Sequence, residues 1–204
     1  LSFTDRGGWF YALHQENGAE ETVVFRADMD AIKGPGNIPY HGCGHDGHSA
    51  ILAGLCLLTE GRVFQKNLCF LFQPAEETGE GGNPCSRLLE ELGADRVYGF
   101  HNLPGYPLGT AVMRRETFSC DTVNTPEITD MSRMLFEQEG IPCLEAAAPF
   151  RWSEDFGWYL KKCQGMYFGI GAGEDCPDLH TPDYEFPDEV IRNAVRCLYL
   201  LAEI

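Results

Sequence analysis

The sequence predicts an α/β fold, specifically a three-layer α/β/α sandwich around a mixed, mostly parallel central sheet. Short apolar and β-branched runs alternate along the chain with segments whose apolar residues recur at helical spacing, a pattern typical of layered α/β domains. The chain has 204 residues, 44% of them hydrophobic, and can therefore bury the core of one such domain. We expect a single domain over residues 1–204.

The expected strands are runs of apolar and β-branched residues bounded by polar or glycine-containing segments. In chain order they cover Trp9–Leu13, Thr22–Ala27, Leu68–Phe72, Val97–Phe100, Thr110–Met113 and Met166–Ile170. Helical patterns lie between several of these strands, as the crossover connections of a parallel sheet require.

The expected helices cover Ser49–Thr59, Pro84–Leu92, Pro126–Glu139, Glu154–Lys161 and Asp188–Ala202. The last of them has a core-facing apolar stripe, formed by Val190, Ile191, Ala194, Val195, Leu198 and Leu201. Asn83 and Pro84 are typical of a helix cap followed by a first-turn proline. The segment Glu116–Pro126 has the weakest pattern, so we expect a junction near residues 119–126.

Charge and cysteine content exclude several classes of protein. Fifteen basic against 31 acidic residues give a net charge of −16, which repels phosphate backbones and anionic membranes, so we expect no nucleic-acid or membrane partner. No apolar run approaches the ~18 residues that a membrane span needs, and no signal peptide is visible. The nine cysteines occur without a CxxC pair, which favours reduced thiols and a cytoplasmic location.

Polar, chemically versatile residues follow several of the expected strands. FRADMD ends the strand at Thr22–Ala27, FQPAEE ends the strand at Leu68–Phe72, and GFHNLPG ends the strand at Val97–Phe100. HGCGHDGH leads into the helix at Ser49–Thr59. Active sites of open α/β sheets gather where strands end and loops begin, so these segments predict one shared site.

These segments contain a mixed set of metal-ligating side chains, namely Cys43, His45, Glu76, Glu77, His101 and His180. Thiolate, imidazole and carboxylate together suit zinc and its neighbours. Each residue alone also has an explanation without metal. A histidine in a glycine-rich turn can be exposed and without function, a glutamate pair can be solvated, a buried histidine can have a hydrogen-bond partner, and a thiol can be packed in the core. Their concentration at several strand ends favours a metal site.

The number of candidate ligands exceeds what one tetrahedral ion needs, so we expect two divalent ions about 3.5–4 Å apart. The Cys43 thiolate could bridge them, and Gly44 leaves the backbone free to bring Cys43 and His45 together. The adjacent Glu76 and Glu77 point different ways at a strand end. One of them can bind metal while the other acts as a general base on the attacking water.

Six sequence blocks occur in order: RADMDA (Arg26–Ala31), HGCGHDGHSA (His41–Ala50), FQPAEE (Phe72–Glu77), GFHNLP (Gly99–Pro104), SEDF (Ser153–Phe156) and LHTPDYEF (Leu179–Phe186). With them the chain resembles the dinuclear-metal amidohydrolase and carboxypeptidase family, which includes hippurate hydrolase, N-acyl-amino-acid amidohydrolases and auxin-conjugate hydrolases. The resemblance runs from about Val23 to the C-terminus, and the CGHDGH and PAEE blocks together make it specific.

The resemblance implies a role for each candidate residue. The implied metal ligands are Cys43, His45, Glu77, His101 and His180. Glu76 is implied as the general base, and Asp28 and Asp46 as residues that orient the ligands. Two divalent ions are implied, and zinc, manganese and nickel all suit these side chains. Glu154 of the SEDF block could also support the site, although an acidic residue at a helix start is the simpler account of it. His48 is expected to face the packing between helix and loop.

The chain departs from the family in one respect. Family members carry a lid or dimerisation domain between the two halves of the catalytic domain, whereas here Ser119–Thr122 is followed directly by Val123–Glu127. The lid normally supplies a histidine that steadies the oxyanion and groups that hold the substrate carboxylate. Loss of one oxyanion donor costs about 10²–10³ in rate, so activity is expected to be weak or to use other donors.

Three functions follow from these features. The first is a metal-dependent hydrolase that cleaves an amide bond of a small N-acyl amino acid or dipeptide. The second is a lidless exopeptidase similar to metalloaminopeptidases. The third is a catalytically impaired metal-binding or scaffolding domain, because site geometry does not guarantee function. A homo-oligomer is possible, although not through a lid.

Overall fold

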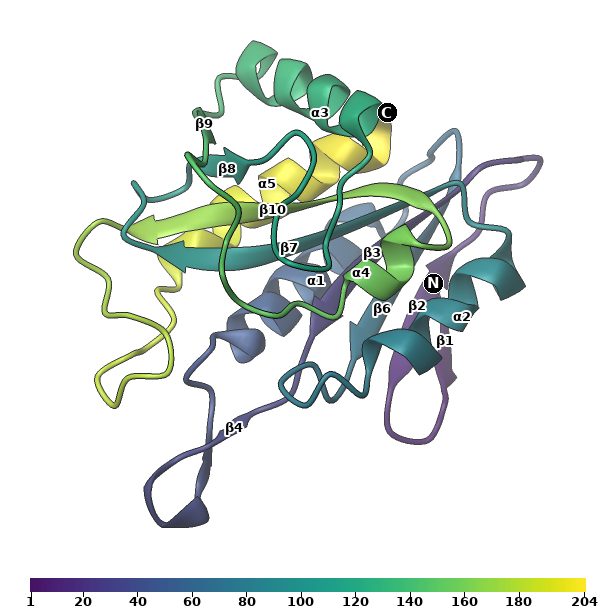
Figure 1. Cartoon of the computed structure of the whole chain (residues 1–204). Helices are drawn as coiled ribbons and strands as arrows, with labels where there is room; N and C mark the ends of the chain where they lie inside the picture. The colour runs from purple at the N-terminus through teal and green to yellow at the C-terminus, as the bar shows by residue number, and fades with distance from the viewer.

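The computed structural model describes residues 1–204, without the side chain of Pro35. Its main sheet has eight strands in the order β1-β2-β6-β3-β7-β10-β8-β9. The strands are β1 (Ser2–Asp5), β2 (Phe10–His14), β3 (Thr22–Asp28), β6 (Asn67–Gln73), β7 (Arg96–Pro104), β8 (Ala111–Met113), β9 (Cys143–Glu145) and β10 (Gln164–Gly173). A separate hairpin of β4 (Ile32–Lys33) and β5 (Pro39–Tyr40), with a short 3₁₀ turn (Pro35–Asn37) between them, projects from the body of the molecule (Figure 1).

The centre of the sheet is parallel and its margins are mixed. Strand β3 pairs in parallel with β6 and β7, and β7 pairs in parallel with β10. Strands β1, β2 and β8 join by antiparallel pairing, and β9 runs parallel to β8. The four central strands therefore point the same way, and their carboxyl ends meet at one edge of the sheet.

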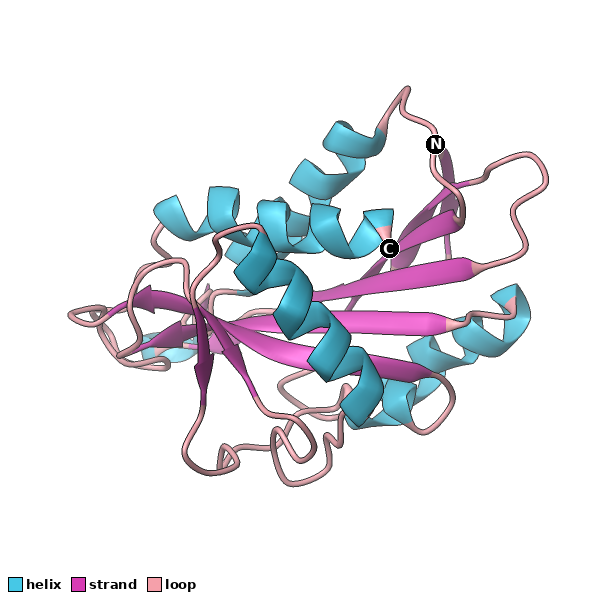
Figure 2. Ribbon diagram, turned by 90° about the horizontal axis from the view of Figure 1, so that it is seen from above, coloured by secondary structure: helices cyan, strands magenta, loops and turns pink.

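Helices cover both faces of this sheet (Figures 1 and 2). They are α1 (His45–Thr59), α2 (Gly82–Leu92), α3 (Pro126–Gln138), α4 (Gly157–Leu160) and α5 (Glu189–Glu203). One buried apolar cluster joins α1, α3 and α5 to the sheet, and a second joins α2 and α4 to the opposite face. Residues of β3 alternate between the clusters, with Val23 and Phe25 in the first and Val24 in the second. The predicted three-layer sandwich with a mixed, mostly parallel sheet is confirmed.

The expected strands and helices all have counterparts, and three details were wrong. Helix α1 begins at His45 and not at Ser49, so His45 lies in its first turn. Helix α2 begins at Gly82 with Gly81 as its cap, so Asn83 is inside the helix. The expected helix at Glu154–Lys161 shrinks to Gly157–Leu160, because the carboxylates of Glu154 and Asp155 turn into the core instead of continuing the helix.

The strands that the sequence pattern missed are β1, β4, β5 and β9, which are short and largely exposed. The segment near residues 119–126 forms a tight turn. The Phe118 N–H donates to the Thr122 carbonyl at 2.9 Å and the Thr122 N–H donates to the Ser119 carbonyl at 3.3 Å. The chain thus passes from β8 to α3 through a closed turn. Among the described residues, no helix is long and apolar enough to cross a membrane.

Two leucines of α1 provide a matched test of this packing. Leu55 is 0% exposed in the core, whereas Leu57 is 72% exposed on the same helix. We expect Leu55→Ala to lower the free energy of unfolding by about 2–5 kcal/mol, because it removes buried apolar area and leaves a cavity. Leu57→Ala should change it by less than about 0.5 kcal/mol. Urea unfolding measures both, and equal losses would contradict the assigned face of α1.

Candidate metal centre

Loops at one edge of the sheet bring the predicted ligands together. Cys43 and His45 lie at the start of α1, His101 lies in the last part of β7, and Glu77 follows β6. His180 comes from the loop after β10. The backbone N–H of His180 donates to the Gly42 carbonyl at 2.7 Å. This bond fixes the His180 loop beside the Cys43 turn.

The ligand atoms form two groups that share Cys43. In the first, Cys43, His45 and His101 each place a ligand atom within 4.8 Å of the others, and in the second Cys43, Glu77 and His180 do the same. The Cys43 Sγ lies 3.5 Å from the His101 Nε2. The His180 Nε2 lies 3.3 Å from the Glu77 Oε1, and the His45 Nε2 lies 3.9 Å from that same oxygen.

Hydrogen bonds set the tautomers of two of these histidines. The Nδ1 of His45 lies 3.0 Å from the Asp30 carbonyl oxygen, and the Nδ1 of His101 lies 2.8 Å from the Asn102 carbonyl oxygen. A carbonyl oxygen can only accept, so each Nδ1 carries a proton and donates it. This leaves both Nε2 atoms to face the cluster, the arrangement in which histidine binds metals.

Unpaired buried atoms show that a cation fits. The Nε2 of His45 and the Oε1 of Glu77 are buried without a hydrogen-bond partner among the described groups. Buried polar atoms are seldom left without a partner, because their desolvation is then uncompensated. Both atoms belong to the shared cluster, and a divalent ion bound there would satisfy them.

The electrostatics of the cluster also favour positive charge. Although burial opposes it, Asp28, Asp30 and Cys43 raise the pKa of His45 to about 12. Burial, followed by the charges of Glu154 and Asp28, raises the pKa of Glu76 to about 9. Burial likewise raises the pKa of the Cys43 thiol to about 12. A bound cation would lower the pKa values of Cys43 and Glu76 again, since it favours the thiolate and the carboxylate over their protonated forms.

Asp30 holds the two glutamates in place. Its Oδ1 accepts the Glu76 N–H at 3.0 Å and its Oδ2 accepts the Glu77 N–H at 3.1 Å. The preceding Ala75 has a φ of 55°, in the left-handed region, which is sparsely populated by residues other than glycine and costs about 1–3 kcal/mol. His180 shares this feature, with a φ of 64°. Strained backbone therefore presents Glu77 and His180 to the cluster.

Asp28, for which the resemblance implies an orienting role, lies beside the candidate ligand His45. It is fully buried, accepts a hydrogen bond from Arg26 at 2.6 Å, and pairs with the Nδ1 of His48. One of its oxygens lies 3.8 Å from the His45 Nε2. The other ring nitrogen of His48 contacts the Asn102 side chain at 2.6 Å. Both ring nitrogens of His48 thus contact side chains of strands, Asp28 of β3 and Asn102 of β7. Asp28, His45 and His48 also place ligand atoms within 4.8 Å of one another.

Two residues differ from their expected placement. Asp46 is exposed in the first turn of α1, where an acidic residue suits the helix dipole, and among the described side chains no hydrogen bond joins it to a candidate ligand. Glu154, expected as a helix-start acid, is instead 3% exposed. One of its oxygens accepts the Tyr167 hydroxyl, and the other lies 3.4 Å from Arg26. The cluster of Glu76, Glu154 and Asp155 places their oxygens within 4.8 Å of one another.

Sequence reasoning missed Asp30 and underestimated Glu154. Asp30 stands two residues after Asp28 in the same RADMDA block. Its closeness to Asp28, a candidate site residue, could have indicated that it also belongs to the site. For Glu154 the SEDF block was a local signal of a role at the site, but its burial was not predicted, because its partners Arg26 and Tyr167 lie far from it in the sequence.

A three-layer α/β/α domain with a mixed thiolate, imidazole and carboxylate cluster is typical of metal-dependent hydrolases. The chain belongs to peptidase family M20/M25/M40, whose family model matches residues 24–204.

Curated relatives match part of the chain. An N-acetyldiaminopimelate deacetylase of Listeria monocytogenes serotype 4a (strain HCC23) is 35% identical over 116 residues, which are 50% of this chain and 31% of the relative. An uncharacterized hydrolase of Staphylococcus aureus (strain USA300) is 33% identical over 152 residues, 64% of this chain and 39% of the relative. The matches thus cover only about a third of the length of these relatives.

Solved structures share the fold. The YXEP protein of Bacillus subtilis, described as a dinuclear metal binding peptidase from the M20 family, superposes with a TM-score of 0.81 at 16% identity and covers 98% of this chain and 86% of that one. The LapA aminopeptidase of Legionella pneumophila superposes with a TM-score of 0.73 at 16% identity and covers 100% of this chain and 58% of that one. At these identities the likeness shows the fold.

Asp30 and Asp46 provide a matched test of the site. Asp30→Ala removes the acceptor of both glutamate N–H groups, so we expect zinc affinity to fall about 10–100-fold, as for other residues that orient metal ligands. Asp46→Ala should leave zinc affinity unchanged, because its carboxylate is exposed outside the cluster. Competitive zinc titration of folded protein, checked by circular dichroism, measures both. Equal zinc affinity in the two variants would reject the role of Asp30.

Proposed function

We propose that this protein is a metal-dependent hydrolase that cleaves the amide bond of a small N-acyl amino acid. The observation that carries the proposal is the pair of ligand groups sharing Cys43, with the carboxylate of Glu76 beside them. The relatives described as N-acetyldiaminopimelate deacetylases support an N-acetylated diamino acid as one substrate. A cytoplasmic location and a possible homo-oligomer remain predictions.

Two divalent cations, zinc, manganese or nickel, suit the donor set. Cys43 would hold both, with His45 and His101 on one side and Glu77 and His180 on the other. This division gives each cation nitrogen and sulfur ligands, and it uses the unpaired Nε2 of His45 and Oε1 of Glu77. When bound, the cations supply Lewis acidity to a water molecule and to the scissile carbonyl.

In this proposal Glu76 moves the proton. One of its oxygens lies 4.0 Å from the His45 Nε2. Its carboxylate lies within 4.8 Å of ligand atoms of His45 and Glu77, but it is not a member of the two groups that share Cys43. It takes a proton from water as the oxygen attacks the carbonyl carbon. It then returns that proton to the amide nitrogen as the carbon–nitrogen bond breaks, which releases a carboxylic acid and an amine.

The neighbouring acids favour an acylated over a free amine as substrate. A free amine needs an unpaired carboxylate as its anchor, but Asp155 is bound to Arg26 at 2.7 Å and to the Gly82 N–H at 2.7 Å. Glu154 accepts the Phe156 N–H at 3.0 Å and the Tyr167 hydroxyl. The carboxylates beside Glu76 are therefore committed within the protein. An exopeptidase acting on free amines is the weaker candidate.

Substitution of Glu76 tests the proposal. With N-acetyldiaminopimelate as substrate and two equivalents of zinc or manganese, we expect Glu76→Gln to lower kcat about 10²–10⁴-fold, because the general base is lost. Metal content, measured by elemental analysis, should be unchanged. Cys43→Ser should lower metal content instead, since it removes the shared ligand.

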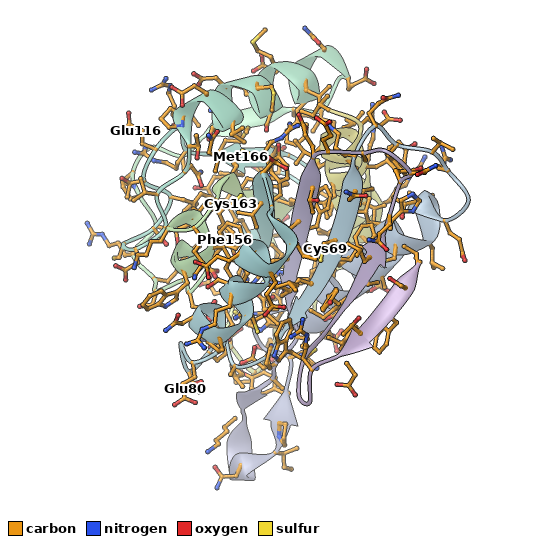
Figure 3. All side chains as sticks on the ribbon, turned by 90° about the vertical axis from the view of Figure 1, so that its right-hand side faces the viewer. Cys69, Glu80, Glu116, Phe156, Cys163 and Met166 are labelled. Atoms are coloured by element: carbon orange, nitrogen blue, oxygen red, sulfur yellow. The ribbon has the colours of Figure 1, made fainter. Side chains whose placement is uncertain are left out.

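Glu80→Gln is the matched control. Glu80 lies in the same loop as Glu76 but is exposed, and it projects outward at the lower left of Figure 3. We expect its kcat to equal that of the unsubstituted protein. Metal-dependent turnover that survives Glu76→Gln would reject Glu76 as base. Bound metal without turnover of any N-acyl amino acid or dipeptide would favour the metal-binding or scaffolding function.

A further inference from the structure

A trench beside the metal centre is lined by residues of the SEDF segment, of α4 and of the loops that carry Glu76, Glu77 and His180. Its volume is about 640 Å³, within the usual range for small-molecule sites. Glu76, Glu77 and His180 line one part of it, and Trp158 and Lys161 line another. A single small molecule in this trench can therefore meet both the candidate metal ligands and the residues around α4.

The charges along the trench are uneven. The carboxylates that line it are Glu76, Glu77, Asp121, Glu154 and Asp155. Among the described residues that line it, Lys161 is the one lysine or arginine. In a chain with a net charge of −16, an anionic group entering the trench needs a fixed positive charge to offset repulsion.

The side chain of Lys161 is held in place while its charge stays available. Its Nζ lies 4.3 Å from the centre of the Trp158 ring, close enough for a cation–π interaction. Trp158 is 38% exposed, so this contact lies at the surface of the trench. Lys162, the next residue, is by contrast paired with Glu90 at 2.6 Å. Ion pairs among the described side chains do not include Lys161, so its ammonium is free for a ligand.

We propose that Lys161, supported by Trp158, binds the carboxylate of the amino-acid part of the substrate while the acyl amide lies at the metal centre. The inference rests on the proposed hydrolysis of N-acyl amino acids, whose free carboxylate distinguishes them from amides and from internal peptide bonds. In this proposal Lys161 is a group within this domain that holds the substrate carboxylate. Lys161 thus acts as a substrate-binding and specificity-determining residue.

The test compares N-acetyl-L-alanine with N-acetyl-L-alaninamide, which lacks the negative charge. With the zinc-loaded protein we expect Lys161→Ala to raise KM for the acid about 10-fold, the usual effect of losing one charge-assisted hydrogen bond. We expect kcat to stay within about twofold and KM for the amide to stay unchanged, since the chemistry occurs elsewhere. Lys161→Arg keeps the positive charge, so its KM for the acid should lie close to that of the unsubstituted protein.

Lys162→Ala is the matched control, because its ammonium is paired with Glu90 outside the trench. It should change neither KM. A direct readout uses zinc-loaded Glu76→Gln protein, in which calorimetry measures binding without turnover. There Lys161→Ala should weaken binding of N-acetyl-L-alanine about 10-fold and leave the amide unaffected.

The outcomes separate the two proposals. If the protein turns over acyl amino acids but Lys161→Ala changes neither KM nor the binding constant of the acid, the role of Lys161 is overturned and the hydrolase stands. If turnover is absent but Lys161→Ala still weakens binding of the acid alone, the carboxylate site stands and the hydrolase fails. Equal losses for the acid and the amide would overturn the carboxylate site.

Discussion

The buried guanidinium of Arg26 is the interaction on which the arrangement of the site depends. Its side chain is 0% exposed and donates to Asp28 at 2.6 Å, to Asp155 at 2.7 Å and to Gln73 at 2.9 Å. A buried cation is tolerated only when such partners surround it, and removing one partner of a buried pair costs about 3–5 kcal/mol. Arg26 thereby joins β3, β6 and the SEDF segment, which are distant in the sequence, at the edge of the sheet where the ligands meet.

The network around Arg26 leaves an excess of negative charge at the metal centre. One guanidinium faces Asp28, Glu154 and Asp155, and the ligand carboxylates lie just beyond. Burial and then this excess raise the pKa of Glu76, and Asp28 raises that of His45 against the opposing effect of burial. Divalent cations would complete the charge balance, so metal binding and stability should be linked. The same field explains why an anionic substrate needs a separate positive group in the trench.

The sequence predicted the fold and most of the candidate ligands, because both have local signals. Apolar periodicity marks strands such as β3, and ligand-rich segments follow the strands whose carboxyl ends meet. The errors came from contacts between distant residues. Glu154 and Asp155 leave the helical pattern because Arg26 and Gln73 hold them in the core. Asp46, for which the resemblance implies an orienting role, is exposed in the first turn of α1. The carboxylate of Asp30 instead reaches across to the loop after β6 and accepts the Glu76 and Glu77 N–H groups.

The turn at Ser119–Thr122 borders the trench in which substrate binding is proposed. Because Phe118 and Ser119 bond back to Thr122, the two halves of the chain meet without an inserted segment, and Asp121 of this turn lines the trench beside Trp158. In the proposed function, contacts to the substrate come from the strand ends and from the residues around α4. Positioning contributes several kcal/mol to catalysis when the reacting groups are held in a productive geometry. Trp158 and Lys161, whose side chains contact each other at 4.3 Å, follow the SEDF segment that Arg26 anchors, and the proposed function gives them that task.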